Sequence, residues 1–360
     1  MNKIILLLCF FVIAAPAVVV GQHSGVQTLI REGVALHDEG EYEKAIGKYM
    51  EALGLEPNCI QAVYELSLSY LALKDYANAE KYSAAVIESE NKQLSPGAYA
   101  VKSEALGEMG QADKAIALLQ QGLEKYGDEY LLHFNLAINY YKQGDTDKAL
   151  IHVRRAIDLD KTPSGAFLLN AYVLNEKGLW VQSILSFQMF LLLEPDSKRS
   201  KNAFEEMLQT MCLKKSEAPV ERSFIQQQMM RNKPEASVQP NKMPPLTTEE
   251  GLDRSMVYRA ITGTLDSLKK NDAEADEFKL FMTVNRKIMK VLEAESIGPK
   301  EGIFWTYYIP FFAHIEQSDY YNTFCRYISV SYYPESLEWW QQHKDAAGNF
   351  VRWFENGDDN

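Results

Sequence analysis

One short segment recurs five times in the first half of this chain, at nearly constant intervals. Each copy ends at a small residue, and successive ends lie 34, 36, 34 and 34 residues apart: Ala45, Ala79, Ala115, Ala149 and Ser183. A period of this length, with two amphipathic helices per unit, is typical of a helical solenoid, in which each unit packs against its neighbours. The repeat therefore predicts an all-α stack of helix pairs for residues 22–197.

Two positions recur within the repeat unit, and the geometry of a helix pair explains both. Five residues before the final small residue, four copies have Gly and the second has Lys74: Gly40, Gly110, Gly144 and Gly178. This position predicts the left-handed residue that ends the first helix, a conformation that costs a residue with a side chain about 1 kcal/mol. Seven residues earlier, another small residue lets the two helices cross closely: Gly33, Ser67, Ser103, Ala137 and Ala171.

With these positions in register over five copies, residues 22–197 resemble five tetratricopeptide repeats, beginning near Val26, Ile60, Pro96, Tyr130 and Ser164. The resemblance implies a solenoid in which the first helix of each repeat lines a concave, partner-binding surface. Residues 198–215 continue the helical apolar spacing and are predicted to cap the array.

The rest of the chain divides by composition. Residues 1–21 combine Lys3, an apolar run from Ile4 to Ala15 and small residues, which predicts a secretory signal peptide cleaved after Ala17 or Gly21. Residues 216–248 read as a Pro-rich linker, and residues 249–355 as an aromatic-rich helical domain. We expect this domain to fold independently of the array, since about 105 residues suffice for a core. The mature chain is expected to lack a transmembrane segment and to reach the periplasm or extracellular face of a bacterial envelope.

The charge balance narrows the class of partner. Lys and Arg number 37 against 49 Asp and Glu, a formal charge of −12. Proteins that bind the phosphate backbone carry the opposite excess, which argues against nucleic acid as a partner. Residues 22–197 alone carry 15 basic and 25 acidic residues, so a protein or peptide with basic groups is the expected partner.

The concave face implied by the resemblance selects a candidate protein-binding groove that is mainly aromatic and acidic. It comprises Ile30, Val34, His37, Asp38, Tyr64, Leu68, Glu104, Glu108, Phe134, Ile138, Tyr141, Leu168, Tyr172, Asn175 and Glu176. Such a surface suits a peptide or helix with apolar and basic residues. A second interpretation stays open, in which Tyr64, Phe134 and Tyr172 pack between adjacent repeats instead.

A search for chemistry finds no phosphate loop, serine nucleophile elbow, zinc-protease helix or calcium loop, so we predict no catalytic residue, cofactor or metal site. After removal of the leader three cysteines remain: Cys59, Cys212 and Cys325. Each has apolar neighbours and is predicted to be a buried thiol, although one disulfide among the three stays open.

The sequence thus favours a non-enzymatic protein-interaction scaffold of a bacterial envelope. Two alternatives remain for the C-terminal domain. One is an enzyme with polar residues among aromatic ones, such as Glu316, Asp319, Arg326 and Glu335. The other is glycan or peptidoglycan binding by stacking on indole rings, for which the candidates are Trp305, Trp339, Trp340 and Trp353.

Overall fold

The computed structural model describes residues 20–214, 252, 254–270 and 276–356. Every regular element in these ranges is a helix, which confirms the all-α prediction. The predicted linker and all but the last two residues of the predicted leader lie outside the described residues. Among the described helices, none is both long and apolar enough to cross a membrane.

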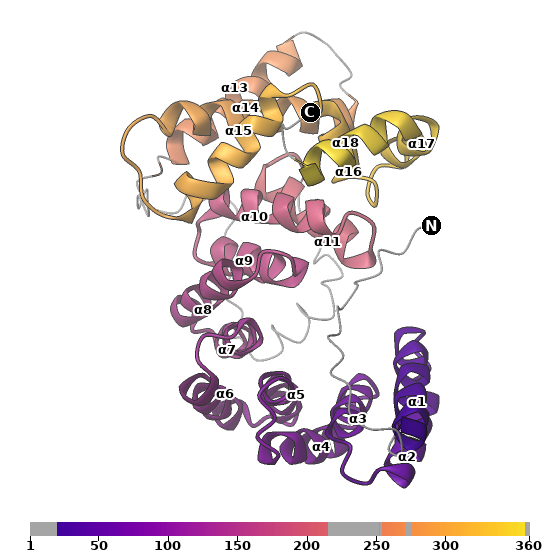
Figure 1. The fold of residues 1–360 in the computed structure, drawn as a ribbon. Coiled ribbons are helices and arrows are strands. Elements are labelled where there is room, and N and C mark those ends of the chain that lie inside the picture. Colours follow the sequence, from indigo (N-terminus) through magenta and orange to yellow (C-terminus); the bar gives the residue numbers. More distant parts are fainter. Residues whose placement is uncertain (1–19, 215–251, 253, 271–275, 357–360) are drawn as a thin grey trace. The chain divides into compact units, whose positions relative to one another are not determined.

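The chain divides into two compact units, residues 1–127 and 128–360. The first unit contains three helix pairs (Figure 1): α1 (Val20–Asp38), α2 (Tyr42–Leu55), α3 (Ile60–Ala72), α4 (Tyr76–Glu88), α5 (Ser95–Glu108) and α6 (Ala112–Tyr126). These pairs coincide with the first three sequence repeats. The division between the units therefore falls inside the repeat array, after Gly127.

The second unit contains the last two repeats and all described helices that follow. The repeat helices are α7 (Tyr130–Gln143), α8 (Thr146–Leu159), α9 (Ser164–Glu176) and α10 (Trp180–Leu193), and α11 (Lys198–Thr210) comes next. The C-terminal helices are α13 (Arg254–Lys270), α14 (Glu277–Glu295), η2 (Phe304–Tyr308), α15 (Ile309–Gln317), α16 (Tyr321–Tyr327), α17 (Pro334–Gln342) and α18 (Lys344–Asn356). The element η2 is a π-helix.

The turn between the two helices of each repeat has the predicted left-handed residue. The φ angle is +83° at Gly40, +76° at Gly110, +83° at Gly144 and +72° at Gly178. Lys74 adopts the same conformation, with a φ of +62°, despite its side chain. The N–H of the next residue, Asp75, donates to the Tyr70 carbonyl at 2.9 Å, as Glu41 does to Leu36 in the first repeat. The packing of the repeat therefore imposes the turn even where Gly is missing.

The small position on the first helix allows the close crossing that the sequence predicted. In the first repeat, a Cβ atom placed on Gly33 of α1 would lie 2.3 Å from Cε1 of Tyr49 on α2. The Tyr49 ring thus occupies the space that a side chain at position 33 would need, and Tyr49 is fully buried.

Helix α10 departs from the pattern of a repeat helix, which normally leaves one face in water. None of its residues from Val181 to Leu192 is more than 4% exposed. One face packs on α9, and the C-terminal helices cover the other (Figure 1). The Gln188 and Asn285 side-chain amides donate to each other at 3.0 Å, and the Ser186 hydroxyl lies 3.4 Å from that of Tyr308.

Helix α11 is covered in the same way. Its Phe204 ring contacts the rings of Phe281, Tyr332 and Tyr333, with centroids 5.0 to 5.5 Å apart. The C-terminal helices therefore share a core with α10 and α11, because they bury the apolar surface of these two helices. Independent folding of the C-terminal region stays a prediction.

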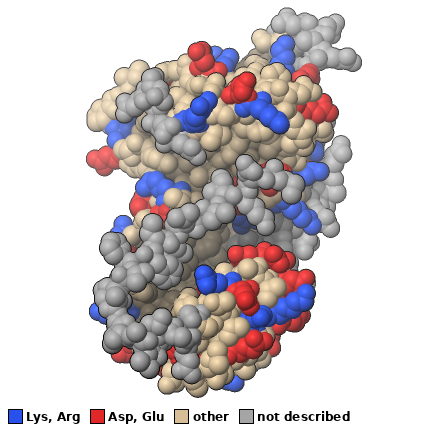
Figure 2. Space-filling view, turned by 45° about the vertical axis from the view of Figure 1, so that its right-hand side comes forward, with Lys and Arg blue, Asp and Glu red and all other residues tan. Residues whose placement is uncertain are grey.

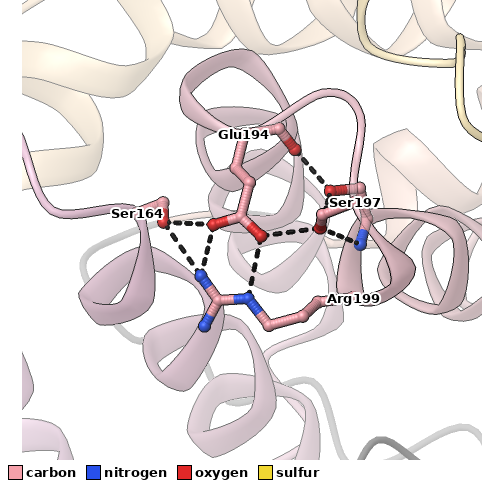
Figure 3. Close-up of polar contacts among 5 residues, drawn as sticks. Ser164, Glu194, Ser197 and Arg199 are labelled. Atoms are coloured by element: carbon pink, nitrogen blue, oxygen red, sulfur yellow. Dashed lines mark hydrogen bonds and ion pairs between the residues drawn. The ribbon is translucent and has the colours of Figure 1, made fainter. Parts of the chain in front are cut away.

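A polar cluster fixes the corner between α10 and α11 (Figure 3). The Glu194 carboxylate accepts hydrogen bonds from Arg199 Nε at 2.8 Å, from Ser197 at 2.6 Å and from Ser164 of α9 at 2.7 Å. Burial opposes ionisation here, but these hydrogen bonds outweigh it and lower the pKa of Glu194 to about 2. The cluster holds the start of α11 against the fifth repeat.

We expect Asn285→Ala to lower the free energy of unfolding of the second unit by roughly 1 to 3 kcal/mol, because the buried Gln188 amide loses both hydrogen bonds. The double change to Leu at positions 188 and 285 should cost less than the sum of the single Leu changes. All five Trp residues belong to this unit, so Trp fluorescence during urea unfolding reports on it. The exposed amide change Gln341→Ala is the control, and equal losses for Asn285→Ala and Gln341→Ala would contradict the expectation.

Candidate protein-binding surface

The structure divides the fifteen groove positions between the two units. Eight belong to α1, α3 and α5 of the first unit, and seven to α7 and α9 of the second. Four are at least nine-tenths buried and are not available to a partner: Ile30, Tyr141, Leu168 and Tyr172. Val34, His37, Tyr64, Leu68, Glu108, Phe134 and Ile138 are half-buried, and Asp38, Glu104, Asn175 and Glu176 are more open.

Two of the aromatic positions pack between repeats. The Tyr64 hydroxyl lies 2.3 Å from where a Cβ atom of Gly97 would be, and Phe134 Cζ lies 3.3 Å from the equivalent point on Gly165. Phe134 also stacks on Tyr130 at 5.6 Å between ring centroids. These rings fill space above a Gly of the following repeat, so part of each ring is structural. The surface that remains open is more acidic than the sequence mapping suggested.

Several carboxylates lie where helical electrostatics disfavour them. Asp38, Glu108 and Glu176 are the last residues of α1, α5 and α9, at the negative end of each helix dipole, where Lys and Arg are normally favoured. Glu104 and Glu108 are four residues apart on one helix, a like-charge spacing that destabilises an isolated helix. Figure 2 shows Asp and Glu gathered on the lower part of the molecule, which is the first unit, among fewer Lys and Arg.

The mapping missed one carboxylate, Glu65 on α3. It is half-buried, and burial together with the charge of Asp38 raises its pKa to about 7. It is also the only charged residue of α3, which is otherwise apolar or neutral. A single charge in such a helix is the signal that could have identified it from the sequence.

We expect Glu65→Gln to stabilise the first unit at pH 8. A carboxyl whose pKa is raised in the folded state favours folding at low pH, and this contribution disappears as the pH rises from about 4.5 through about 7. Gln removes the cost of the buried charge, so the free energy of unfolding should rise by roughly 1 to 3 kcal/mol at pH 8 and change little at pH 4.5. Hydrogen exchange of the α3 amides in the full chain measures this.

The control for that measurement is Glu124→Gln, which removes a carboxylate of α6 in the same unit, far along the chain from α3. It should leave the pH profile unchanged. An equal effect of both changes, or destabilisation by Glu65→Gln at pH 8, would contradict the expectation.

The Trp residues of the C-terminal helices have their ring faces occupied. Trp339 stacks on His343 with centroids 4.6 Å apart, and Trp353 stacks on His314 at 5.3 Å and on Tyr320 at 5.0 Å. Trp305 is 4% exposed, with Lys300 Nζ 4.5 Å from its ring centroid. Trp340 is half-buried against Tyr327. Side chains of the protein therefore occupy faces that a sugar ring would need.

Two of the four polar residues suggested for an enzyme, Glu316 and Arg326, have structural contacts. The buried Glu316 carboxylate lies 3.3 Å from Arg286 and 3.5 Å from Lys290. Arg326 packs over the Phe278 and Trp339 rings. Asp319 and Glu335 are exposed. Within the described residues, no group of three His, Cys, Asp or Glu side chains could hold a metal ion.

The cysteines follow the prediction in two of three cases. Cys59 and Cys325 are buried free thiols, whereas Cys212 is exposed and was wrongly expected to be buried. Cys212 has a φ of +58° and follows α11, where the Leu213 N–H turns back to the Leu208 carbonyl. This left-handed turn points the side chain away from the apolar face of the helix. The three thiols form no disulfide with one another.

The structure is that of a helical-repeat protein whose first helices carry acidic and aromatic side chains. Models of the tetratricopeptide repeat match residues 30–97 and 130–163, so these parts of the chain are tetratricopeptide repeats. Proteins of this family generally act as protein-interaction scaffolds.

Curated relatives share only part of their length with this chain. Intraflagellar transport protein 70A of Danio rerio is 36% identical over 21% of this chain and 14% of its own length. BBSome complex member BBS4 of Xenopus tropicalis is 28% identical over 33% of this chain and 22% of its own length. The chain thus spans less than a quarter of either relative.

Solved structures include TTC0263, a thermophilic TPR protein of Thermus thermophilus, with 20% identity and a TM-score of 0.46. The match covers 52% of this chain and 99% of that one. YrrB, described as a TPR protein with an unusual peptide-binding site, has 18% identity and a TM-score of 0.35, over 52% of this chain and 97% of its own.

Proposed function

We propose that this chain is an exported, non-enzymatic scaffold whose first unit binds a protein segment rich in basic and apolar residues. The observation that carries the proposal is the placement of acids on the first helices of the repeats, at helix ends and in half-buried positions that cost stability. Residues 22–127 contain 9 Lys and Arg against 16 Asp and Glu. A basic partner would offset that cost on binding, and so account for it.

Apolar and aromatic side chains lie close to the carboxylates of the first helices. Leu68 and Tyr64 of α3 are half-buried, and so is Tyr76 at the start of α4. Burial and the nearby charges of Glu108 and Glu104 raise the pKa of Tyr76, which places its hydroxyl near both carboxylates. Rings beside carboxylates favour Arg and Lys, whose stems pack on the ring while the charged end reaches an acid.

The export of the chain is part of the same proposal, and the pattern of residues 1–21 supports it. We expect the protein recovered from the culture or envelope fraction of its native host to begin at Gln22 or at Val18, depending on which small residue precedes the cleaved bond. N-terminal sequencing of the mature protein measures this. An intact Met1 on the recovered protein would contradict export through a cleaved leader.

A selection of displayed random peptides on the full-length protein tests the binding proposal without a known partner. We expect enriched peptides to combine Lys or Arg with apolar residues. Neutralising the inner face with Asp38→Asn, Glu104→Gln and Glu108→Gln should weaken their binding by about tenfold or more, as expected for the loss of contacts worth about 1.4 kcal/mol in total. Binding should also weaken as ionic strength rises.

A matched variant separates this effect from net charge. Glu43→Gln, Glu88→Gln and Glu124→Gln remove three carboxylates from the second helices α2, α4 and α6 and change the net charge by the same amount. This variant should bind the selected peptides as the unaltered protein does. Enrichment of acidic peptides, or equal losses in both variants, would overturn the proposal.

A further inference from the structure

The end of α1 and the middle of α3 enclose a small group of oxygen atoms beside the buried Tyr49 of α2. The His37 Nδ1 atom and the Ser69 hydroxyl share a hydrogen bond of 2.8 Å, which ties α1 to α3 at this level. Asp38 follows His37, and Glu65 lies one helical turn before Ser69 on α3. The two carboxylates are close enough for Asp38 to raise the pKa of Glu65.

Neither carboxylate has a cationic partner. Among the described residues, no Lys or Arg forms an ion pair with Asp38 or with Glu65, although neighbouring acids on the same surfaces do pair. Glu32 of α1 lies 2.7 Å from Lys48, and Glu41 lies 3.0 Å from Lys44. The pair Asp38 and Glu65 therefore concentrates negative charge at the C-terminus of α1, where the helix dipole already opposes it.

A buried hydroxyl lies at the same point. Tyr49 is fully buried, and its hydroxyl makes no hydrogen bond of normal geometry with any described residue. Burial raises the pKa of this hydroxyl, the charges of Glu65 and Asp38 raise it further, and the nearby Ser69 hydroxyl lowers it. A buried polar group without a partner costs free energy, so the position of this hydroxyl near two unpaired carboxylates indicates a missing ligand atom.

We propose that Asp38, Glu65 and the Tyr49 hydroxyl form the seat for one cationic side chain, Lys or Arg, of a bound protein segment. This inference rests on the proposed function and names the point at which the basic partner is anchored. The ligand donates N–H groups to the two carboxylates and to the Tyr49 oxygen, which satisfies all three groups at once. A metal ion fits less well, because no group of three His, Cys, Asp or Glu side chains among the described residues could hold one.

The seat couples binding to protonation. The ionisable groups near Glu65 are Asp38 at the end of α1, Tyr49 of α2 and Tyr64 of α3, and His37 of α1 shares a hydrogen bond with Ser69 one turn further along α3. Burial is the main cause that raises the pKa of Glu65, and the charge of Asp38 adds to it. Because that pKa is about 7, the ionised fraction of Glu65 is roughly tenfold larger at pH 8 than at pH 6. A cation that needs the ionised form should therefore bind roughly tenfold more weakly at pH 6.

The experiment uses the full-length protein with ¹³C-labelled Glu and Asp carboxyls, and Nα-acetyl-argininamide as the probe, since its only charge is on the side chain. We expect the Glu65 and Asp38 resonances to shift saturably at pH 8 and to need roughly tenfold more probe at pH 6. Nα-acetyl-norleucinamide, which is apolar and has no charge, should have no effect. With the Asp38 resonance as the readout, Glu65→Gln should weaken binding of the arginine probe at least fivefold at pH 8. The same change should remove the pH dependence of probe binding.

The control variant Glu124→Gln should bind the probe as the unaltered protein does. The proposal is overturned if neither resonance shifts with the arginine probe, or if the norleucine compound shifts them equally. It is also overturned if Ca²⁺ alone saturates the two carboxylates and displaces the probe. These measurements need no protein partner. If basic peptides bind the first unit but the arginine probe shifts neither carboxyl resonance, this inference is wrong and the proposed function still stands.

Discussion

The close crossing of two helices in each repeat is the contact on which the rest of this structure depends. It requires a small residue on the first helix and a ring or apolar side chain on the second, as at Gly33 and Tyr49. The crossing determines which face of the first helix remains open. It also places the hydroxyl of Tyr49, on α2, near Ser69 and Glu65 of α3. One packing contact thereby places a buried polar atom under the acidic inner surface.

The repeats were predictable from the sequence because their constraints are local. A left-handed turn and a small crossing residue each leave a mark at a fixed position, and these marks locate the helix pairs without any knowledge of the tertiary structure. The burial of α10 was not recognised, although it also left a sign: no residue from Trp180 to Leu193 is charged. A repeat helix with one solvent-exposed face normally has charged or polar residues on that face. The absence of charged residues indicates that other helices pack on the second face of α10. It does not identify them, since they lie much further along the chain.

The site was less predictable than the fold, and for a different reason. The family pattern identified helix faces, and these included Asp38 but not Glu65. The significance of Glu65 comes from its proximity to Asp38 and from its burial, which involve residues on different helices. Likewise, Tyr141, Leu168 and Tyr172 are on first helices but are buried. Tyr172 packs on Phe187 of the second helix of its own repeat, a contact between two helices that residue spacing along one helix does not reveal.

The acids of the first unit show how function and stability compete in this array. Repeat proteins gain stability from contacts between neighbouring repeats, so one unfavourable position can be tolerated if the adjacent interfaces are well packed. The first repeat has such packing around Val26, Ile30 and Tyr49, all of them buried. A half-buried carboxylate next to another acid can therefore persist at a cost of a few kcal/mol without unfolding the unit. Positions that violate local electrostatic preferences in a stable framework are where binding function is expected, since selection for folding alone would remove them.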